Sequence, residues 1–416
     1  AAVRRAMGLH RPARGAAGRY AAGPRAPGGR DGAAAALRHP CRRRGLQRSR
    51  RPAERPRPRN IFKLVAGRSL DDGDLASQPT LSRFENAVDT ATLQQLIDFT
   101  IDTGVERLAD RQSTKRLPSR VTLDIDAFDD PTHGQQQLSL YHGYYQQHQY
   151  FPVAISEPTT KHVLLTSLRP GTVHAALGAE DDLMRVVDRL RAKRSNIAVH
   201  VRGDCGFGMP WVFETLENHG VDYTLGLSGN ARLQRFMKPH LERAERLYEA
   251  TGEKQRLFTC FSYQADAWDR HRTVVAKIEH HDKGSNLRFV MTSLPIHDAD
   301  GAQRIYETYV QRGESEQRID ELKNHLHTDR LSCHRFRANF WRLLLHTAAY
   351  NLLAALRDHE RVPDELRHAH ALTWRTRLIK VAATVTQTTR RVVVHLAGHW
   401  PRWPCYHALG QRALAG

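Results

Sequence analysis

The stretch "RVTLDIDAF", residues 120–128, alternates polar and apolar side chains from Arg120 to Ala127. Its apolar positions begin at Val121 and recur every second residue, so they share one face of an extended chain. The opposite face carries two carboxylates, Asp124 and Asp126. The pattern predicts a β-strand that buries one face and presents acids on the other, near its carboxyl end.

The regions that follow predict further strands with helices between them. Residues 137–158 are typical of a hairpin, and residues 196–204 form an apolar run that ends on Asp204. Helical spacing of apolar residues appears in both halves of 77–110 and again at 179–194. Another strand is expected at 222–228, and strands dominate 230–300 after a basic helix. The order predicts an α/β fold interrupted by a β-rich insertion.

The segment "YVQRGESEQRIDELK", residues 309–323, predicts a polar stripe on one continuous helix over 302–326. Tyr309, Arg312, Glu316 and Lys323 are spaced by three, four and seven residues. At about 100° per residue they fall within an arc of roughly 60°. An ion pair between Arg312 and Glu316 on a solvated face would explain only part of this stripe.

Three acids on separate elements suggest a site for divalent cations. Asp126 and Asp204 lie at strand ends, and Glu316 lies on the later helix. Two Mg²⁺ ions about 3.5–4 Å apart need shared carboxylate ligands of this kind for phosphoryl transfer. Each acid alone is more often a cap or a solvated residue, and Asp124 competes with Asp126 because both share a strand face. No GxxxxGK[ST] motif is present, so a P-loop nucleotide site is not indicated.

In combination, these motifs resemble the DDE transposases of bacterial insertion sequences, and more narrowly the insertion-sequence thirteen-eighty family. The resemblance covers about residues 61–400. It is carried by "LDIDAFDDPTHGQQ" (123–136), "GTVHAA" (171–176), "RGDCGF" (202–207), "DYTLGLSGNARL" (222–233) and the 309–323 segment. That last segment matches the Y-(2)-R-(3)-E-(6)-K signature of the related superfamily without a gap. The resemblance implies an RNase H-like catalytic domain with a β-rich insertion and a helical amino-terminal segment.

The resemblance also implies roles for individual residues. Asp126, Asp204 and Glu316 match the catalytic, metal-binding acids, although Phe128 stands where the family has threonine. Tyr309, Arg312 and Lys323 match residues that contact DNA phosphates. Trp268 in the insertion matches an aromatic that stacks on a flipped base, with Arg270 and Arg272 beside it; a core tryptophan is the alternative for Trp268.

Activity and partners follow from the same resemblance. The expected reaction is Mg²⁺-dependent cleavage at the ends of the element and strand transfer into target DNA; Mn²⁺ can substitute. Expected partners are double-stranded DNA, as terminal inverted repeats and target, and a second copy of the chain. Two alternatives stay open: an inactive remnant that only binds DNA, and an RNase H-like nuclease without strand transfer.

Composition divides the chain into a basic arm and a balanced body. Residues 1–60 contain 17 of the 63 basic residues but only two of the 44 acids, Asp31 and Glu54. They are expected to be a disordered basic arm, or the product of a shifted reading frame in a GC-rich gene. The five scattered cysteines and the lack of a long apolar run favour a bacterial cytoplasmic protein that does not enter membranes.

The expected domains follow these boundaries. After the basic segment come a helical DNA-binding region, the first part of the catalytic domain, the insertion, the second part of the catalytic domain, and a basic carboxyl-terminal region. Their ranges are 1–60, 61–118, 119–229, 230–300, 301–360 and 361–416.

Overall fold

The computed structural model describes residues 76–112, 114–358, 362–387 and 392–407. The basic segment 1–60 and residues 61–75 of the helical region therefore lie outside the described residues. Within the described ranges, no helix is long and apolar enough to cross a membrane.

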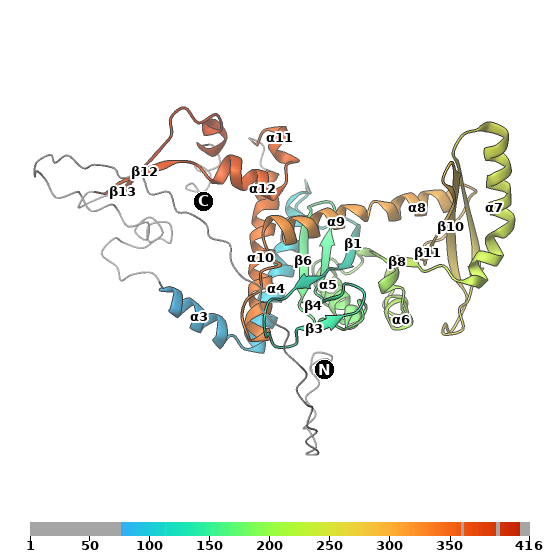
Figure 1. Cartoon of the computed structure of the whole chain (residues 1–416), viewed down its shortest axis with the longest axis horizontal. Helices are drawn as coiled ribbons and strands as arrows, with labels where there is room; N and C mark the ends of the chain where they lie inside the picture. The colour runs from blue at the N-terminus through green and yellow to red at the C-terminus, as the bar shows by residue number, and fades with distance from the viewer. Residues whose placement is uncertain (1–75, 113, 359–361, 388–391, 408–416) are drawn as a thin grey trace, which may run out of the picture. The chain divides into compact units, whose positions relative to one another are not determined.

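An eight-stranded sheet forms the centre of the described fold (Figure 1). The strand predicted from "RVTLDIDAF" is β1, and it pairs antiparallel with β5 and parallel with β7. In spatial order the strands are β6 (His162–Ser167), β5 (Val153–Glu157), β1 (Arg120–Ala127), β7 (Ala198–Gly203), β8 (Asp222–Leu227), β11 (Gly284–Thr292), β10 (Arg272–His281) and β9 (Gln255–Tyr263).

The first five strands have the RNase H-like arrangement. Strand β5 runs antiparallel to both of its neighbours, β6 and β1, and β7 and β8 continue parallel to β1. The expected fold class is confirmed: the protein is a mixed α/β structure with a large central sheet. Parallel strands need crossover connections, and the helices α5 (Ala179–Lys193) and α6 (Pro210–Asn218) lie in the connections from β6 to β7 and from β7 to β8.

The insertion strands continue the central sheet. Strand β11 pairs antiparallel with β8, and β10 and β9 follow it outward. Residues on β10 alternate: Val274, Ala276 and Ile278 join the main core on the α7 side, whereas Val275 joins a smaller core beneath α8. Both faces of the insertion are thus covered.

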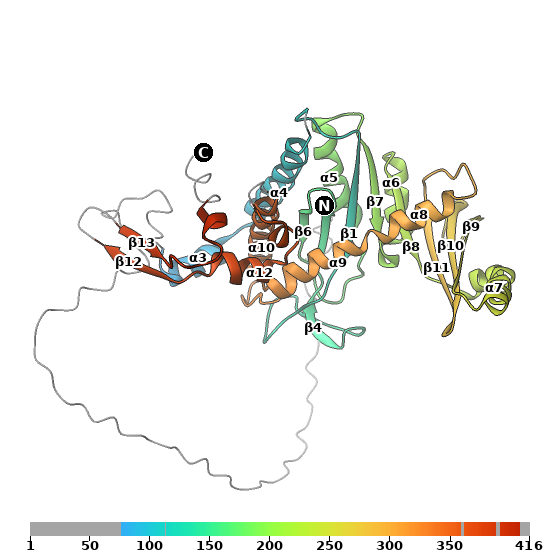
Figure 2. The ribbon, with the colours of Figure 1, turned by 90° about the horizontal axis from the view of Figure 1, so that it is seen from above.

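Helices lie on both faces of the sheet, as Figure 2 shows. Helices α4, α5 and α6 lie on one side, α8 and α9 lie on the other, and α10 lies beside β6 and contacts α4. The helices are α3 (Gln78–Ala87), α4 (Thr90–Asp110), α5 (Ala179–Lys193), α6 (Pro210–Asn218), α7 (Ala231–Thr251), α8 (Gly301–Val310), α9 (Gly313–Asp320), α10 (Phe336–Arg357), α11 (Asp364–Arg367) and α12 (Ala371–Trp374).

Short elements complete the described chain. A small sheet joins β2 and β3 to β4, and β12 pairs with β13. Their bounds are β2 (Asp130–Pro131), β3 (Leu140–His142), β4 (Gln147–Tyr150), β12 (Ala383–Gln387) and β13 (Val392–Leu396), with η1 (Cys205–Phe207) and the π-helical η2 (Glu321–His325) and η3 (Arg375–Ile379).

The free edge of β6 is covered by a side chain of α10. The Asn351 amide donates to the carbonyl of Val163 at 2.8 Å and accepts from its backbone N–H at 2.9 Å. An exposed strand edge is a template for unwanted pairing. This contact satisfies the edge and fixes α10 against the sheet.

The prediction of a single continuous helix over 302–326 is wrong. Helix α8 ends at Val310, α9 begins at Gly313, and η2 follows at Glu321. Between α8 and α9 the backbone hydrogen bonds join residues three apart instead of four. The Arg312 N–H donates to the carbonyl of Tyr309 at 2.9 Å, and the Ser315 N–H donates to the carbonyl of Arg312 at 2.7 Å. Gly313, a weak helix former, lies at this break.

Candidate active site

Asp126 lies at the carboxyl end of β1 and has three hydrogen-bond donors. They are the Ala127 N–H at 3.0 Å, the Arg312 guanidinium at 2.8 Å and the Ser315 hydroxyl at 3.3 Å. The pKa of Asp126 is raised to about 6, mainly by burial and also by the charges of Asp204 and Glu316, against the opposing charge of Arg312. The three predicted acids therefore lie within electrostatic range of one another.

Asp204 lies directly after β7, beside Asp126. Strands β1 and β7 are parallel with Ile125 opposite Gly203, and Asp126 and Asp204 are the next residues along each strand. Neighbouring strands are about 4.8 Å apart. The Asp204 carboxylate caps η1 by accepting from the Gly206 N–H at 2.9 Å.

Two glycines keep the turn around Asp204 tight. A Cβ on Gly206 would lie 3.0 Å from the Asp204 carboxylate, and one on Gly226 would lie 2.6 Å from the backbone nitrogen of Cys205 and 2.9 Å from the Tyr309 hydroxyl. Such contacts would force the backbone or Tyr309 to move. Close packing at this corner thus explains why "RGDCGF" and "DYTLGL" have glycine at these positions.

Glu316 lies on α9 and is joined to Asp126 through Arg312. One Arg312 nitrogen donates to Asp126, and the other contacts Glu316 at 3.3 Å. Glu316 is 66% exposed, whereas Arg312 is mostly buried. Arg312 Nε is buried and has no hydrogen-bond partner within the described residues. The guanidinium therefore occupies the space between two predicted metal-binding acids.

The other two members of the stripe lie at the same corner. Tyr309, at the end of α8, is close to the Arg312 guanidinium, which lies 5.8 Å from its ring centre, and burial raises the pKa of Tyr309. Lys323, on η2, is 2.5 Å from Asp129. The structure thus brings all four stripe residues near β1, although they come from three elements and not one helix.

Asp124 differs from Asp126 in every contact. It is fully buried, and both of its oxygens accept hydrogen bonds from arginines, Arg202 and Arg318. A carboxylate held in this way has no oxygen free for a cation. Of the two competing acids, Asp126 is the one placed with Asp204 and Glu316.

The three insertion residues predicted to bind DNA hold the fold together in this structure. Trp268 is only 7% exposed and packs edge-on against Phe213, which corresponds to the core alternative. Arg272 is buried and forms a two-pronged pair with Glu217 at 2.7 and 2.8 Å. Arg270 contacts the same carboxylate but is mostly exposed. Of the three, only Arg270 is open to a ligand without rearrangement.

The donor set suits a hard divalent cation, in competition with Arg312. Carboxylate oxygens are what Mg²⁺ prefers, and Asp126 is an acid whose pKa is raised mainly by burial, with Arg312 only partly opposing the rise. Within the described ranges, however, no three acidic, histidine or cysteine side chains are already gathered closely enough to hold a metal. A cation shared by Asp126 and Glu316 would compete with the Arg312 guanidinium for the same oxygens.

Sequence reasoning assigned no role to three polar residues at this end of β1. Ser315 donates to Asp126, Asp129 pairs with Lys323, and Asp130 is buried with both carboxylate oxygens unpaired among the described residues. The adjacent pair Asp129–Asp130 was visible in "DAFDDPTHG", and its position just after the strand was the available signal.

Comparisons with known proteins were made against families, curated proteins and solved structures. The family model described as "Transposase DDE domain group 1" matches residues 52–414. No curated protein matches the chain.

Solved structures similar to this chain include transposases. The piggyBac transposase synaptic complex with hairpin DNA is 13% identical, with a TM-score of 0.35, and the match covers 64% of this chain and 54% of that one. A pre-cleavage Mos1 transpososome is 15% identical, with a TM-score of 0.18 and coverage of 47% and 60%. The matched regions thus span little more than half of those chains.

The family match extends over most of the chain and includes every candidate acid. This match shows that the protein belongs to the DDE transposases of domain group 1, and the RNase H-like strand order agrees with it.

Proposed function

We propose that this chain cleaves double-stranded DNA at the ends of a bacterial insertion sequence of the thirteen-eighty family and joins the freed ends to target DNA. The observation that carries the proposal is the environment of Asp126. This buried carboxylate lies beside two other acids and has one partial counter-charge, Arg312. Such an arrangement favours added positive charge, which divalent cations provide.

Asp126, Asp204 and Glu316 are the proposed ligands of two Mg²⁺ ions, for which Mn²⁺ can substitute. When bound, such ions supply Lewis-acid activation of the attacking hydroxyl and neutralise charge on the phosphodiester. Asp126 must be ionised to take part, and its pKa of about 6 permits this at neutral pH. Ser315 and the Ala127 N–H then keep its oxygens oriented.

We propose that Arg312 pairs with the acids in the absence of DNA and with a phosphate when DNA is bound. Without DNA it neutralises Asp126 and Glu316; with DNA its planar guanidinium is suited to a bidentate bond with a phosphate. Its Nε, buried without a partner among the described residues, supports this exchange because a phosphate oxygen would satisfy it. Tyr309 and Lys323 contact the same DNA backbone in this proposal, and Arg270 contacts DNA from the insertion.

The remaining features of the proposal concern the whole chain. The acting form is a homodimer that holds two terminal inverted repeats, in the bacterial cytoplasm. The domain boundaries expected from the sequence are part of the proposal, with the insertion joined to the catalytic sheet through β8 and β11.

The test uses duplexes made from the DNA that flanks the coding sequence, incubated with the full chain and either Mg²⁺, Mn²⁺ or EDTA. Cation-dependent nicking at a repeat end, followed by joining to a target plasmid, is the expected result. Gel-shift binding without nicking would instead identify a DNA-binding remnant, and nicking without joining would identify a nuclease. The variant Asp126→Asn is the matched control and should bind the duplex without nicking it.

A further inference from the structure

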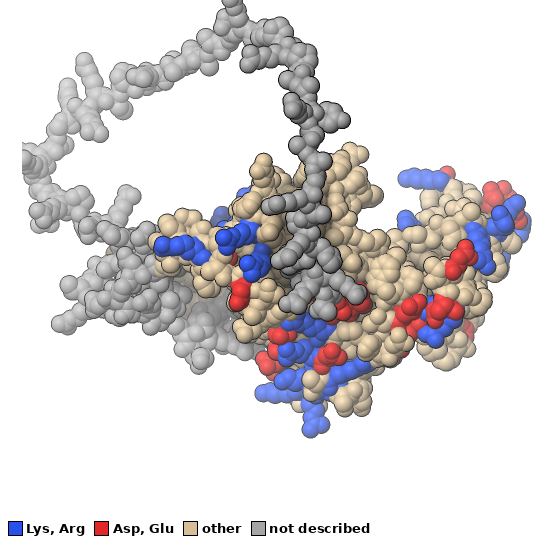
Figure 3. Space-filling model, turned by 90° about the horizontal axis from the view of Figure 1, so that it is seen from below, with Lys and Arg blue, Asp and Glu red and all other residues tan. Residues whose placement is uncertain are grey.

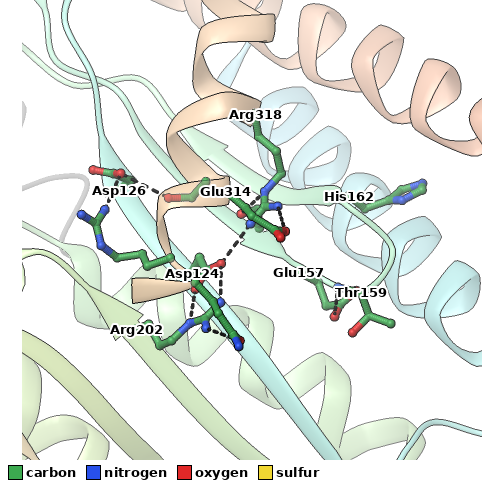
Figure 4. Close-up of polar contacts among 12 residues, drawn as sticks. Asp124, Asp126, Glu157, Thr159, His162, Arg202, Glu314 and Arg318 are labelled. Carbon is green, nitrogen blue, oxygen red and sulfur yellow. Dashed lines mark hydrogen bonds and ion pairs between the residues drawn. The ribbon is translucent and has the colours of Figure 1, made fainter. Parts of the chain in front are cut away.

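Three buried ionic side chains lie against the candidate acids. Asp124, Arg202 and Arg318 are 0%, 2% and 4% exposed. Arg202 donates to both Asp124 oxygens at 2.6 and 2.9 Å, and Arg318 donates to one of them at 2.9 Å (Figure 4). We call Asp124, Arg202 and Arg318 the buried triad.

Each member of the buried triad lies two residues from one candidate acid. Asp124 precedes Asp126 on β1, Arg202 precedes Asp204 at the end of β7, and Arg318 follows Glu316 on α9. Residues two apart on a strand point to the same face of the sheet. The triad therefore connects the same three elements that carry the acids.

On α9, residues two apart point in nearly opposite directions, about 200° apart. Arg318 therefore reaches into the sheet, where its Nε also donates to Ser156 on β5 at 3.1 Å, while Glu316 is exposed. Ser315, three residues before Arg318 on the same helix face, contacts Asp126. These two contacts anchor the helix that carries the third acid.

The other contacts that hold this helix are the Arg312–Asp126 ion pair directly before its first residue and the packing of Ile319 against the main core. The helix is eight residues long, it follows the break after α8, and it runs directly into the π-helical η2. Arg202 also fixes the break itself, because its Nη1 donates to the carbonyl of Thr308 near the end of α8 at 2.5 Å. Arg318 and Arg202 thus give α9 and the end of α8 directional contacts to β1, β5 and β7.

Stability alone does not explain the triad. Two guanidiniums and one carboxylate are expensive to remove from water, and well-packed apolar replacements of similar size are often equally stable or more so. What an apolar cluster lacks is direction: a guanidinium fork fixes the angle and register of the groups it joins.

We infer that Asp124, Arg202 and Arg318 are positioning residues, which set the spacing of the Asp126, Asp204 and Glu316 carboxylates and thereby the affinity of the site for divalent cations. The inference rests on the proposed function, because it assumes that these acids bind such cations. The buried triad itself touches neither cation nor DNA.

The experiment replaces the whole triad with apolar residues of similar size. The triple variant Asp124→Leu/Arg202→Met/Arg318→Met is compared with the wild type by thermal unfolding, by Mn²⁺ titration followed by electron paramagnetic resonance, and by gel shift on duplex DNA. We expect a similar melting temperature and similar DNA affinity, with Mn²⁺ affinity reduced at least tenfold. Cleavage at equal Mn²⁺ occupancy should fall as well.

A matched control removes a different ion pair in the same manner. Glu85→Leu/Arg342→Met eliminates the 2.9 Å contact between α3 and α10, and Mn²⁺ affinity should stay at the wild-type value. If the triple variant does not fold, Arg318→Lys retains the charge but loses the fork, and it should bind Mn²⁺ several-fold more weakly with an unchanged melting temperature.

The outcomes separate the two hypotheses. If the folded triple variant binds Mn²⁺ with wild-type affinity, the positioning role is overturned and the proposed function stays intact. If the triple variant does not fold, wild-type Mn²⁺ affinity in Arg318→Lys has the same meaning. Failure of the wild-type chain itself to bind Mn²⁺ would overturn both the proposed cation site and the inference that depends on it.

Discussion

Carboxylates on the insertion side of the sheet and carboxylates at the end of β1 have opposite environments. Glu217 and Glu279 are both partly buried, which by itself raises the pKa, but hydrogen bonds from arginines and lysines lower each pKa to about 2. Burial raises the pKa of Asp126 to about 6 and that of Asp130 to about 8, and nearby acids add to both shifts.

The difference shows which acids the fold neutralises by itself. Glu217 has Arg270 and Arg272, and Glu279 has Lys254, Arg256 and Lys277. At the end of β1 the described chain supplies fewer cations than acids. On the face drawn in Figure 3, basic and acidic side chains lie close to one another.

The largest effect is expected for Asp126→Asn. Cleavage should fall on the order of 10³-fold, equivalent to about 4 kcal/mol of transition-state stabilisation, because a neutral amide is a poor cation ligand. Cleavage and unfolding measured on the same preparation test this. A variant that cleaves at the wild-type rate would contradict the assignment.

Stability of the Asp126→Asn variant should change with pH in a defined direction. The folded pKa of Asp126, about 6, lies above the unfolded value of about 3.9. The stability associated with the protonated form is therefore present below pH 4 and is lost as pH rises through 6. Relative to wild type, the variant should gain stability as pH rises from about 4 to about 6, and the gain should stay constant above that range.

The second largest effect is expected when an ion pair between α6 and the insertion is removed. Glu217→Gln leaves the buried Arg272 guanidinium without its carboxylate, and removing one partner of such a pair typically costs several kcal/mol. Urea unfolding at pH 7 should show a loss of about 3 kcal/mol. An unchanged unfolding free energy would mean that Asp269, 2.7 Å from Arg272, is a sufficient partner.

The third effect concerns Asp130, whose oxygens are buried without partners among the described residues. Its folded pKa of about 8 lies above the unfolded value, so ionisation destabilises the fold as pH rises toward 8. Asp130→Asn should be more stable than wild type at pH 9 and nearly equal to it below pH 4, with the difference growing between those two values. Equal stability at pH 9 would contradict the burial argument.

Local patterns predicted the strands and the positions of the acids. The alternation in 120–128 fixed β1, and the apolar run that ends on Asp204 fixed β7, because both depend on residue periodicity. The pairing of β11 with β8, which makes the insertion part of the main sheet, depends on contacts distant in sequence and has no periodic signal.

Two site features also lay beyond sequence reasoning. The break between α8 and α9 arises where Arg312 and Ser315 both contact Asp126, so tertiary contacts accompany a departure from regular helix. The choice between Asp124 and Asp126 likewise required knowledge of Arg202 and Arg318, which come from other elements.

The smallest effect on stability is expected for Arg270→Ala. Arg270 is 58% exposed and contacts Glu217, which retains Arg272 as a partner. Exposed ion pairs contribute little to folding, so the unfolding free energy should not change measurably. In the proposed function Arg270 also contacts a DNA phosphate, and its loss should then weaken DNA binding several-fold at low salt.

Arg304 is the matched control for this prediction. It has the same exposed fraction, 58%, and pairs with an exposed carboxylate, Asp298, at 2.7 Å. A phosphate contact made by Arg270 alone would reduce the slope of log affinity against log salt by about one in Arg270→Ala, and leave it unchanged in Arg304→Ala. Equal slopes for the two variants would show that Arg270 serves the insertion only as a partner of Glu217. The insertion side would then differ from the end of β1 in function as well as in charge, since its ion pairs would be purely structural.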